Sequence, residues 1–456
     1  MSGKPDALPE QGAHAPALRR VLSRTDLVIY GLTIITPTAA YPVFGILQQM
    51  SHGHAALSFL AAVVAMLLTA LSYGRMAAAF PSAGSTYTYA RRSLHDYAGF
   101  LAGWAMLLDY VLVPMLSAVY VTLTAARFFP GVPHAVWPLL FAACVTVVNL
   151  YGIQVTARAS RFMTLIMAIS AVLFVVLAAY TVANRSGASG LYEPVAFYNP
   201  ATFSLSSLVA AAAVATLSFL GFDAVSTLAE DTRDPEKDIG SATVWVCLIQ
   251  TVFCVLISYL AAVVWPASRP FPDVETAILD VSSAVGGQAM FTFTSAVLLV
   301  AAVASSVTSQ AGASRLLYGM GRDGILPRRL FGYLDPKRAT PTRSIYFMGG
   351  LTVAGSLILN FQTVVELVSF GAFTSFILVN LSVIRHYYLR LGERTGVGLL
   401  RNLIFPAGGV VVCALVWLNL GERAKTVGFT WLFLGILYLA ALTRGFRVPV
   451  KQLEYS

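Results

Sequence analysis

Three observations predict an all-α integral membrane protein: its composition, the spacing of its apolar segments and the placement of its basic residues. Of the 456 residues, 57% are hydrophobic and only 11% are charged, whereas a soluble domain carries about 25% charged residues. No polar stretch is long enough to build a separate soluble domain.

Apolar segments of bilayer length follow one another along the chain. About twenty apolar residues cross a bilayer as a helix, and this length gives twelve transmembrane segments. They cover residues 25–49, 56–79, 98–126, 134–151, 161–183, 205–229, 241–265, 289–316, 344–360, 364–386, 401–420 and 427–443. An even number of crossings puts both termini on the same side of the membrane.

The basic residues give the orientation. With the amino terminus in the cytoplasm, 25 of the 30 Lys and Arg residues fall in cytoplasmic loops or tails, as the positive-inside rule requires. The remaining five are Arg127, Arg185, Arg269, Arg423 and Lys425. This placement accounts for the net charge of +9 without a nucleic-acid partner.

The ends of the chain and the cysteines carry no sign of processing or of a metal centre. Residues 1–24 are polar, without the apolar core of a signal peptide, so we expect a cytoplasmic tail there and a second one at 444–456. All four cysteines lie in apolar segments, which is typical of small core residues. The spacing of Cys and His residues fits no metal site, and no phosphate-binding loop is present, so we expect neither metal nor cofactor.

Two of the twelve segments contain residues that interrupt a helix. Pro37 and Pro42 lie in the first segment, and Gly221 lies in the sixth between two Phe residues. Proline removes a backbone donor and obstructs the preceding turn. Interrupted helices at positions one and six predict an inverted repeat of five plus five helices around a polar site. The predicted units are 25–183, 205–386 and, for two additional helices, 401–443.

Two acidic residues fall at membrane depth, Asp109 in the third segment and Asp223 in the sixth. Placing a charged side chain at that depth costs about 2.5–3.5 kcal/mol of insertion free energy, so such a residue indicates a functional site. No Lys or Arg lies near the centre of any segment, so the carboxylates suit a cationic substrate or a transported proton. The alternatives are a helix cap for Asp223 and a hydrogen bond to a neighbouring hydroxyl for Asp109.

Other residues near the breaks have a functional and a structural interpretation. Glu230 follows Asp223 by seven residues, on the same face of an α-helix and about 10 Å along it, so it fits either the inward exit path or the solvated charge run after it. Tyr41, Phe219 and Phe222 fit gates, cation contacts or plain packing. The polar run 305–310 fits helix–helix hydrogen bonds or ion coordination.

Several motifs together resemble the amino acid–polyamine–organocation (APC) superfamily of transporters. They are residues 80–89, 218–224 and 314–327, and residues 103–110, 129–133 and 331–333 are similar to those of the bacterial putrescine importers. The resemblance covers nearly all of the chain beyond residue 24. It implies twelve helices in an inverted repeat, alternating access, and uptake driven by an ion gradient, with protons rather than sodium as the coupling ion.

The resemblance also implies a substrate site at the breaks of helices one and six, against helices three and eight. By motif position the site comprises Thr36, Pro37, Thr38, Ala39, Ala40, Tyr41, Asp109, Tyr110, Phe219, Gly221, Phe222, Asp223 and Ser309. In relatives that carry amino acids, amides of a Gly-x-Gly sequence at the first break hold the substrate carboxylate. Pro37 has no amide to offer, which favours amines. Putrescine importers typically have an aspartate where this chain has Pro42, so a monoamine or an amino-acid-like compound stays open.

We therefore expect a bacterial cytoplasmic-membrane transporter, not an enzyme, that imports small putrescine-like amines together with protons and has membrane lipid around it. An amino acid permease of the same superfamily is the first alternative. A non-transporting membrane sensor or scaffold is the second, although the chain has no sizeable soluble output domain. No nucleophile–base pair or metal-ligand cluster in the sequence supports an enzyme.

Overall fold

The computed structural model describes residues 22–81, 85–151, 153–322, 326–335 and 340–445. Most of the two predicted tails, residues 1–21 and 446–456, lies outside this part. The described residues are helical apart from loops and two isolated bridges, Leu22 with Thr232 and Asp335 with Thr340.

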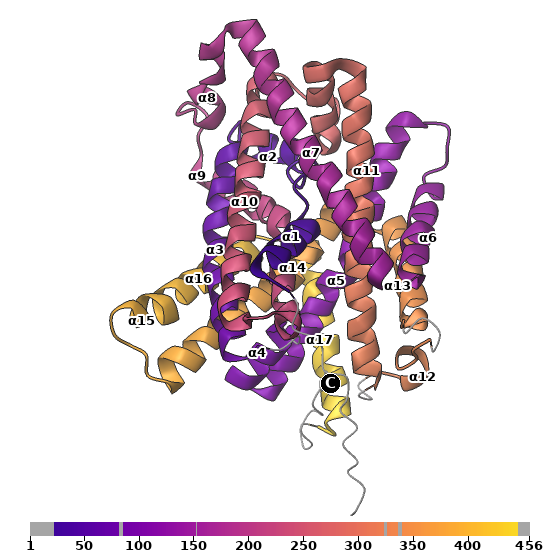
Figure 1. Ribbon diagram of the computed structural model, residues 1–456, viewed down its shortest axis with the longest axis vertical. Helices are drawn as coiled ribbons and strands as arrows, with labels where there is room; N and C mark the ends of the chain where they lie inside the picture. The colour runs from indigo at the N-terminus through magenta and orange to yellow at the C-terminus, as the bar shows by residue number, and fades with distance from the viewer. Residues whose placement is uncertain (1–21, 82–84, 152, 323–325, 336–339, 446–456) are drawn as a thin grey trace, which may run out of the picture.

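Seventeen α-helices, together with shorter 3₁₀ and π segments, make up the described part of the chain (Figure 1). In chain order they are α1 (Arg24–Ile35), α2 (Phe44–Met50), α3 (Ala55–Ala79), α4 (Ser85–Ser93), α5 (Asp96–Phe128), α6 (Val136–Leu150), α7 (Ile153–Ser186), η1 (Ala188–Leu191), α8 (Pro194–Phe197), α9 (Leu205–Ala215), η2 (Thr216–Phe219), η3 (Phe222–Asp231), α10 (Pro235–Val264), η4 (Val274–Thr276), α11 (Ala277–Arg322), α12 (Arg328–Phe331), α13 (Thr342–Ile358), α14 (Phe361–Val383), η5 (Ile384–Arg390), α15 (Val397–Leu399), η6 (Leu400–Ile404), α16 (Phe405–Leu418) and α17 (Glu422–Leu442).

Nine helices of the described residues are long and apolar enough to cross a membrane, so the protein is a multi-pass membrane protein. Each of the twelve segments expected from the sequence falls on helical structure. Three of these segments are absent from the nine for reasons of length. The first is divided into α1 and α2, of 12 and 7 residues, and α6 and α13 have 15 and 17 residues.

Several helices run beyond the segments expected for them. α7 has 34 residues and α11 has 46, more than the roughly 20 that a bilayer needs. Within α11 the backbone is non-helical at Gly286 and Gly287. The eighth segment, expected from residue 289, therefore begins just after this kink, and the helical turns before it form a separate piece.

Local sequence explains where several helices begin. Ser23 and Asp26 form a reciprocal capping box at the start of α1, and the side chain of Asn360 accepts a hydrogen bond from the amide of Thr363 at the start of α14. Such caps satisfy amides that have no partner within the helix.

Aromatic and small residues hold the bundle together at its centre. The rings of Tyr73, Phe222 and Phe376 meet pairwise at 5.1–6.0 Å between centroids. At Gly74 the backbone of α3 lies directly against Gly240 of α10, since a Cβ at position 74 would be 2.6 Å from the Gly240 Cα. α3 and α10 therefore pack closely against each other.

Two tryptophans join α17, the last helix, to α5. The indole N–H of Trp104 donates to the carbonyl of Trp431, the indole of Trp431 donates to the carbonyl of Trp104, and both hydrogen bonds are 2.9 Å long. The two rings stack with centroids 4.6 Å apart. α17 is thus attached to the helix that carries Asp109.

Candidate functional site

The first broken helix ends at Thr36 and restarts at Phe44. Thr36 has φ 66° and ψ 124°, a left-handed φ that is a genuine outlier for a β-branched residue. Its amide still donates to Leu32 O at 3.0 Å. The chain then passes through turns closed by hydrogen bonds from the amide of Ala39 to Thr36 O and from the amide of Tyr41 to Thr38 O. The break expected from Pro37 and Pro42 is therefore present.

The second broken helix changes direction at Gly221. α9 tightens into η2, Leu220 is extended, Gly221 has φ 107°, and η3 starts at Phe222. Only glycine adopts this φ without steric cost. A Cβ at Gly221 would also lie 2.3 Å from Ile34 Cγ2 of α1. Position 221 therefore needs glycine both for its backbone and for its close approach to the first broken helix.

The two breaks are joined directly. Ser218 Oγ donates to Ala39 O at 3.0 Å, so a side chain of the second break satisfies a backbone carbonyl of the first. Gln250 of α10 donates from Nε2 to Thr36 O at 3.1 Å. Gln250 is fully buried, and its Oε1 has no hydrogen-bond partner among the described residues. The breaks and α10 form one connected polar unit inside the apolar bundle.

Asp223 is the second residue of η3, and its side chain is buried. The backbone amides of Gly221 and Ala224 lie beside the carboxylate. The N-cap of η3 is Gly221, however, and no side chain caps this helix, so the expected alternative of a cap at Asp223 was wrong. Asp109 of α5 is also buried, and its Oδ1 has no hydrogen-bond partner among the described residues. The expected alternative for Asp109, a bond to a neighbouring hydroxyl, is thus not made at Oδ1.

The two carboxylates belong to one electrostatic neighbourhood. They lie close enough for their charges to interact, and Asp223 acts in the same way on the phenol of Tyr73. None of the ion pairs found in the described part of the chain includes Asp109 or Asp223. Two buried acids therefore lie near each other, and neither forms an ion pair with a Lys, Arg or His of the described residues.

A cavity of about 150 Å³ opens beside the two breaks. It is lined by Thr36, Thr38, Ala39, Pro42, Val43, Leu116, Ser117, Tyr120, Leu217, Ser218, Leu298, Ala301, Ala302, Ser305, Phe361 and Val365. None of these described residues is charged. Thr38 is 1% exposed, and its Oγ1 has no hydrogen-bond partner in the described part of the chain. The cavity thus presents neutral hydroxyl groups on a largely apolar wall.

The cavity and the two acids lie at different depths. On α5 the cavity residues Leu116 and Tyr120 follow Asp109 by seven and eleven positions, about 10–16 Å at 1.5 Å per residue. On the second broken helix, Leu217 and Ser218 precede Asp223. α5 and the second broken helix run in opposite directions under the topology expected from the sequence. Under that expected topology, both acids lie on the same side of the cavity.

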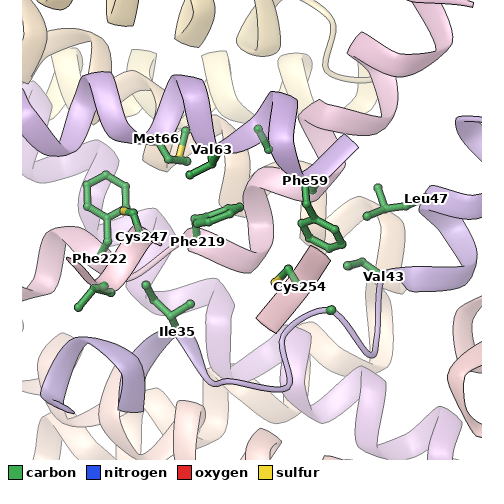
Figure 2. Packing of buried hydrophobic residues seen from close by; sticks show 14 of the residues in the cluster. Ile35, Val43, Leu47, Phe59, Val63, Met66, Phe219, Phe222, Cys247 and Cys254 are labelled. Atoms are coloured by element: carbon green, nitrogen blue, oxygen red, sulfur yellow. The ribbon is translucent and has the colours of Figure 1, made fainter. Parts of the chain in front are cut away.

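Of the site residues expected from the sequence, Thr36, Thr38 and Ala39 line the cavity. Three of the four aromatic residues, Tyr41, Phe219 and Phe222, pack instead. Tyr41 donates to Ser170 O at 3.3 Å and contacts Phe174, and Figure 2 shows Phe219 beside Val63 and Met66 and Phe222 near Cys247. The remaining expected residues are Pro37, Ala40, Tyr110, Asp109, Gly221, Asp223 and Ser309, none of which is among the residues that line the cavity.

In the eighth segment, Gln310 has one of the two roles expected for the polar run, whereas the alignment expected for Glu230 is different. Gln310 bonds to Asn149, Thr146 and the carbonyl of Ile345, so this part of the polar run joins helices. η3 is a 3₁₀ helix with three residues per turn. Positions 223, 226 and 229 are therefore aligned, and position 230 is not in line with 223. The side chain of Glu230 lies outside the described residues.

Sequence reasoning missed Gln250 and the cavity residues of α5. Leu116 and Tyr120 fall near whole numbers of helical turns from Asp109, so a search along that face would have found them. Gln250 carries no such signal, because a single neutral amide in an apolar segment resembles an ordinary helix contact.

Comparisons with known proteins agree on one family. The model of the family described as amino acid permease matches residues 28–422. The low-affinity putrescine importer PlaP of Escherichia coli (strain K12) is 32% identical over 443 residues, which is 96% of each chain. The branched-chain amino acid permease BcaP of Bacillus subtilis (strain 168) is 26% identical over 455 residues, or 92% of each chain. The vacuolar cationic amino acid transporter 4 of Arabidopsis thaliana is 28% identical over 389 residues, 80% of this chain and 63% of the relative.

Proposed function

Because the chain belongs to the amino acid permease family, we propose that it imports a small putrescine-like amine across the bacterial cytoplasmic membrane by alternating access. The observation that carries this proposal is the pair of buried acids, Asp109 and Asp223, whose charges interact and which take part in none of the described ion pairs. A buried charge is stable when it is paired or neutralised. An ammonium group of the substrate supplies this pairing.

The cavity at the breaks supplies the approach to these acids. Thr38, Ser117 and Ser305 offer hydroxyl groups that accept hydrogen bonds from an ammonium, and the apolar wall suits the methylene chain of an alkylamine. The substrate passes from this neutral chamber to the acids deeper in the bundle as the joined breaks reorient. The cavity volume of about 150 Å³ is below the 300–1,000 Å³ typical of cavities that bind drug-sized ligands. A cavity of this size fits a small substrate.

Proton coupling follows from the same acids. With no amine bound, a proton on one carboxyl group removes the cost of two like charges at membrane depth. Amine binding and proton binding then compete or alternate at Asp109 and Asp223, which gives a secondary transporter driven by the proton gradient. Glu230 lies beyond them on the proposed inward path.

The proposed topology is the one expected from the sequence. Twelve helices cross the membrane, with inverted repeats at 25–183 and 205–386, two further helices within 401–443, and both termini in the cytoplasm. The paired breaks at Thr36 and Gly221 support the repeat, and the distribution of Lys and Arg supports the orientation.

A second function, uptake of a neutral amino acid, is favoured by one observation: the described cavity residues include no charged side chain. Against it, Pro37 has no amide for a substrate carboxylate. The relative BcaP carries "branched-chain amino acid" in its name, so leucine is the natural competitor to test.

The test is uptake by the full chain in proteoliposomes with an imposed proton gradient. We expect accumulation of radiolabelled putrescine that unlabelled amines compete and leucine does not. Asp223→Asn keeps the shape and removes the charge, so we expect kcat/KM to fall at least about 30-fold, since loss of one partner of a buried charge pair costs 2 kcal/mol or more.

The exposed acid Glu193 provides the matched control. Glu193→Gln should transport like the parent, and all variants should keep the same thermal unfolding profile. Uptake of leucine in place of every amine would establish the second function, and parental putrescine uptake by Asp223→Asn would exclude the role given to Asp223.

A further inference from the structure

A larger cavity, of about 380 Å³, lies apart from the transport site, between the ends of α3 and α10 and the segment formed by η6 and α16. It is lined by Leu71, Gly74, Arg75, Ala78, Glu236, Gly240, Arg401 and Phe405. The contact between Gly74 and Gly240 leaves no side chains there to fill the space. In Figure 1, α15 and the start of α16 project sideways from the bundle. The residues that line the cavity belong to α3, α10, η6 and α16.

One part of the cavity belongs to the lipid-facing surface. Leu71 is 42% exposed although it lies in an apolar transmembrane helix. The most apolar stretch of Val397–Leu418, which includes Phe405, is only 28% buried within the molecule. In a multi-pass membrane protein such surface is covered by acyl chains, so a lipid tail has direct access to the cavity along Leu71 and Phe405.

The other part of the cavity is charged. Arg75 donates from Nη2 to Glu393 Oε2 at 2.9 Å and to Asn402 Oδ1 at 2.8 Å, and its guanidinium lies 3.7 Å from the centre of the Tyr387 ring. These contacts fix the group, yet its Nε is buried and has no hydrogen-bond partner among the described residues. Arg401 is exposed and takes part in none of the described ion pairs.

The cavity also contains a carboxylate, and this decides which headgroup fits. Exposed Glu236 lies in the first turn of α10, where an acid complements the helix dipole. A purely anionic headgroup would meet this acid unfavourably. A headgroup with both a phosphate and a primary ammonium matches the lining, since a phosphate complements the charges of Arg401 and Arg75 and an ammonium complements that of Glu236.

We propose that this cavity binds a phospholipid of the ethanolamine type, with its phosphate between Arg401 and Arg75, its ammonium at Glu236 and one acyl chain along Leu71 and Phe405. Under the proposed orientation the lipid belongs to the cytoplasmic leaflet. Primary ammonium groups donate hydrogen bonds to a carboxylate, whereas the trimethylated group of a choline lipid has no N–H to donate. The site therefore discriminates between two headgroups of equal net charge.

The test is lipid binding to the delipidated full chain, measured by native mass spectrometry with ethanolamine, choline and glycerol phospholipids of identical acyl chains. We expect the ethanolamine lipid to bind about fivefold more tightly than the choline lipid. Arg401→Gln should weaken binding of the ethanolamine lipid about fivefold, which is the effect of one basic residue at a lipid surface. Glu236→Gln should bring the ethanolamine lipid down to the level of the choline lipid.

Arg329→Gln is the matched control, because Arg329 is exposed on α12, far from α15 in Figure 1, and it should bind lipid like the parent. Equal affinity for the ethanolamine and choline lipids, or tighter binding of the glycerol lipid, would overturn the headgroup assignment. Parental affinity in Arg401→Gln, with an unchanged unfolding temperature, would overturn the site. A dimer of the chain that Arg401→Gln disrupts would assign the cavity to a second copy instead.

Discussion

Thr38 shows, at the scale of a single residue, how the site differs from the core around it. Its hydroxyl is buried in the cavity wall without a hydrogen-bond partner among the described residues. An unsatisfied buried hydroxyl costs about 1–3 kcal/mol. A residue kept at that cost in a cavity wall is suited to contact something that enters the cavity.

We expect Thr38→Val to separate stability from transport. Valine has nearly the same shape and removes the unsatisfied hydroxyl, so the thermal unfolding temperature in detergent should stay level or rise. Uptake of putrescine should fall about tenfold in kcat/KM, the equivalent of one hydrogen bond to a charged group. Equal losses in both measurements would mean that Thr38 has only a packing role.

The sequence revealed some residues of the site and not others for a physical reason. Asp109 and Asp223 stand out because a carboxylate in an apolar segment is costly and therefore informative. Ser117 and Gln250 are neutral, and neutral polar residues serve helix contacts throughout membrane proteins. Their positions at the cavity and at Thr36 O depend on how the helices pack, which composition alone does not determine.

At the scale of elements, the two broken helices are the best-predicted part of the fold. Pro37, Pro42 and Gly221 act on the backbone directly, so their effect is local and can be read from the sequence. The form of the restart is not local: η3 is a 3₁₀ helix, and nothing in residues 222–231 distinguishes it from an α-helix. The expected alignment of positions 223 and 230 was wrong for this reason.

Gly221→Ala tests the connection between the two breaks. The substitution meets an unfavourable φ of 107° and a Cβ position 2.3 Å from Ile34 Cγ2, so the free energy of unfolding should fall by at least about 2 kcal/mol. The measurement is thermal unfolding in detergent followed by circular dichroism. Gly350→Ala is the control, because a Cβ at this exposed position in α13 has no neighbour within 4 Å, and it should be neutral or slightly stabilising.

At the scale of the whole molecule, the multi-pass membrane class was the easiest property to predict, whereas the count of twelve spans and the orientation stay predictions. Twelve apolar segments and a strong bias of Lys and Arg follow from bilayer thickness and the positive-inside rule. What the sequence did not reveal is the offset between the cavity and the acids, because it arises from the packing of α5, α11, α14 and the breaks around one another.

The proposed orientation predicts which loops face the cytoplasm. In a variant without the four native cysteines, Glu193→Cys should react with a membrane-impermeant maleimide added to whole cells. Arg329→Cys should react only after the membrane is permeabilised, because it lies on the opposite side. Labelling in the reverse order would invert the topology, and labelling of both positions from outside would refute the number of crossings between them.

The pairing of Trp104 with Trp431 extends the influence of the transport helix to the periphery. Only 17% of the most apolar stretch of α17 is buried, so this helix meets neighbouring molecules in the bilayer. Reciprocal indole hydrogen bonds transmit any sideways load on α17 to α5 at a point five residues from Asp109. Crowding or assembly in the plane of the membrane therefore has a mechanical route to Asp109.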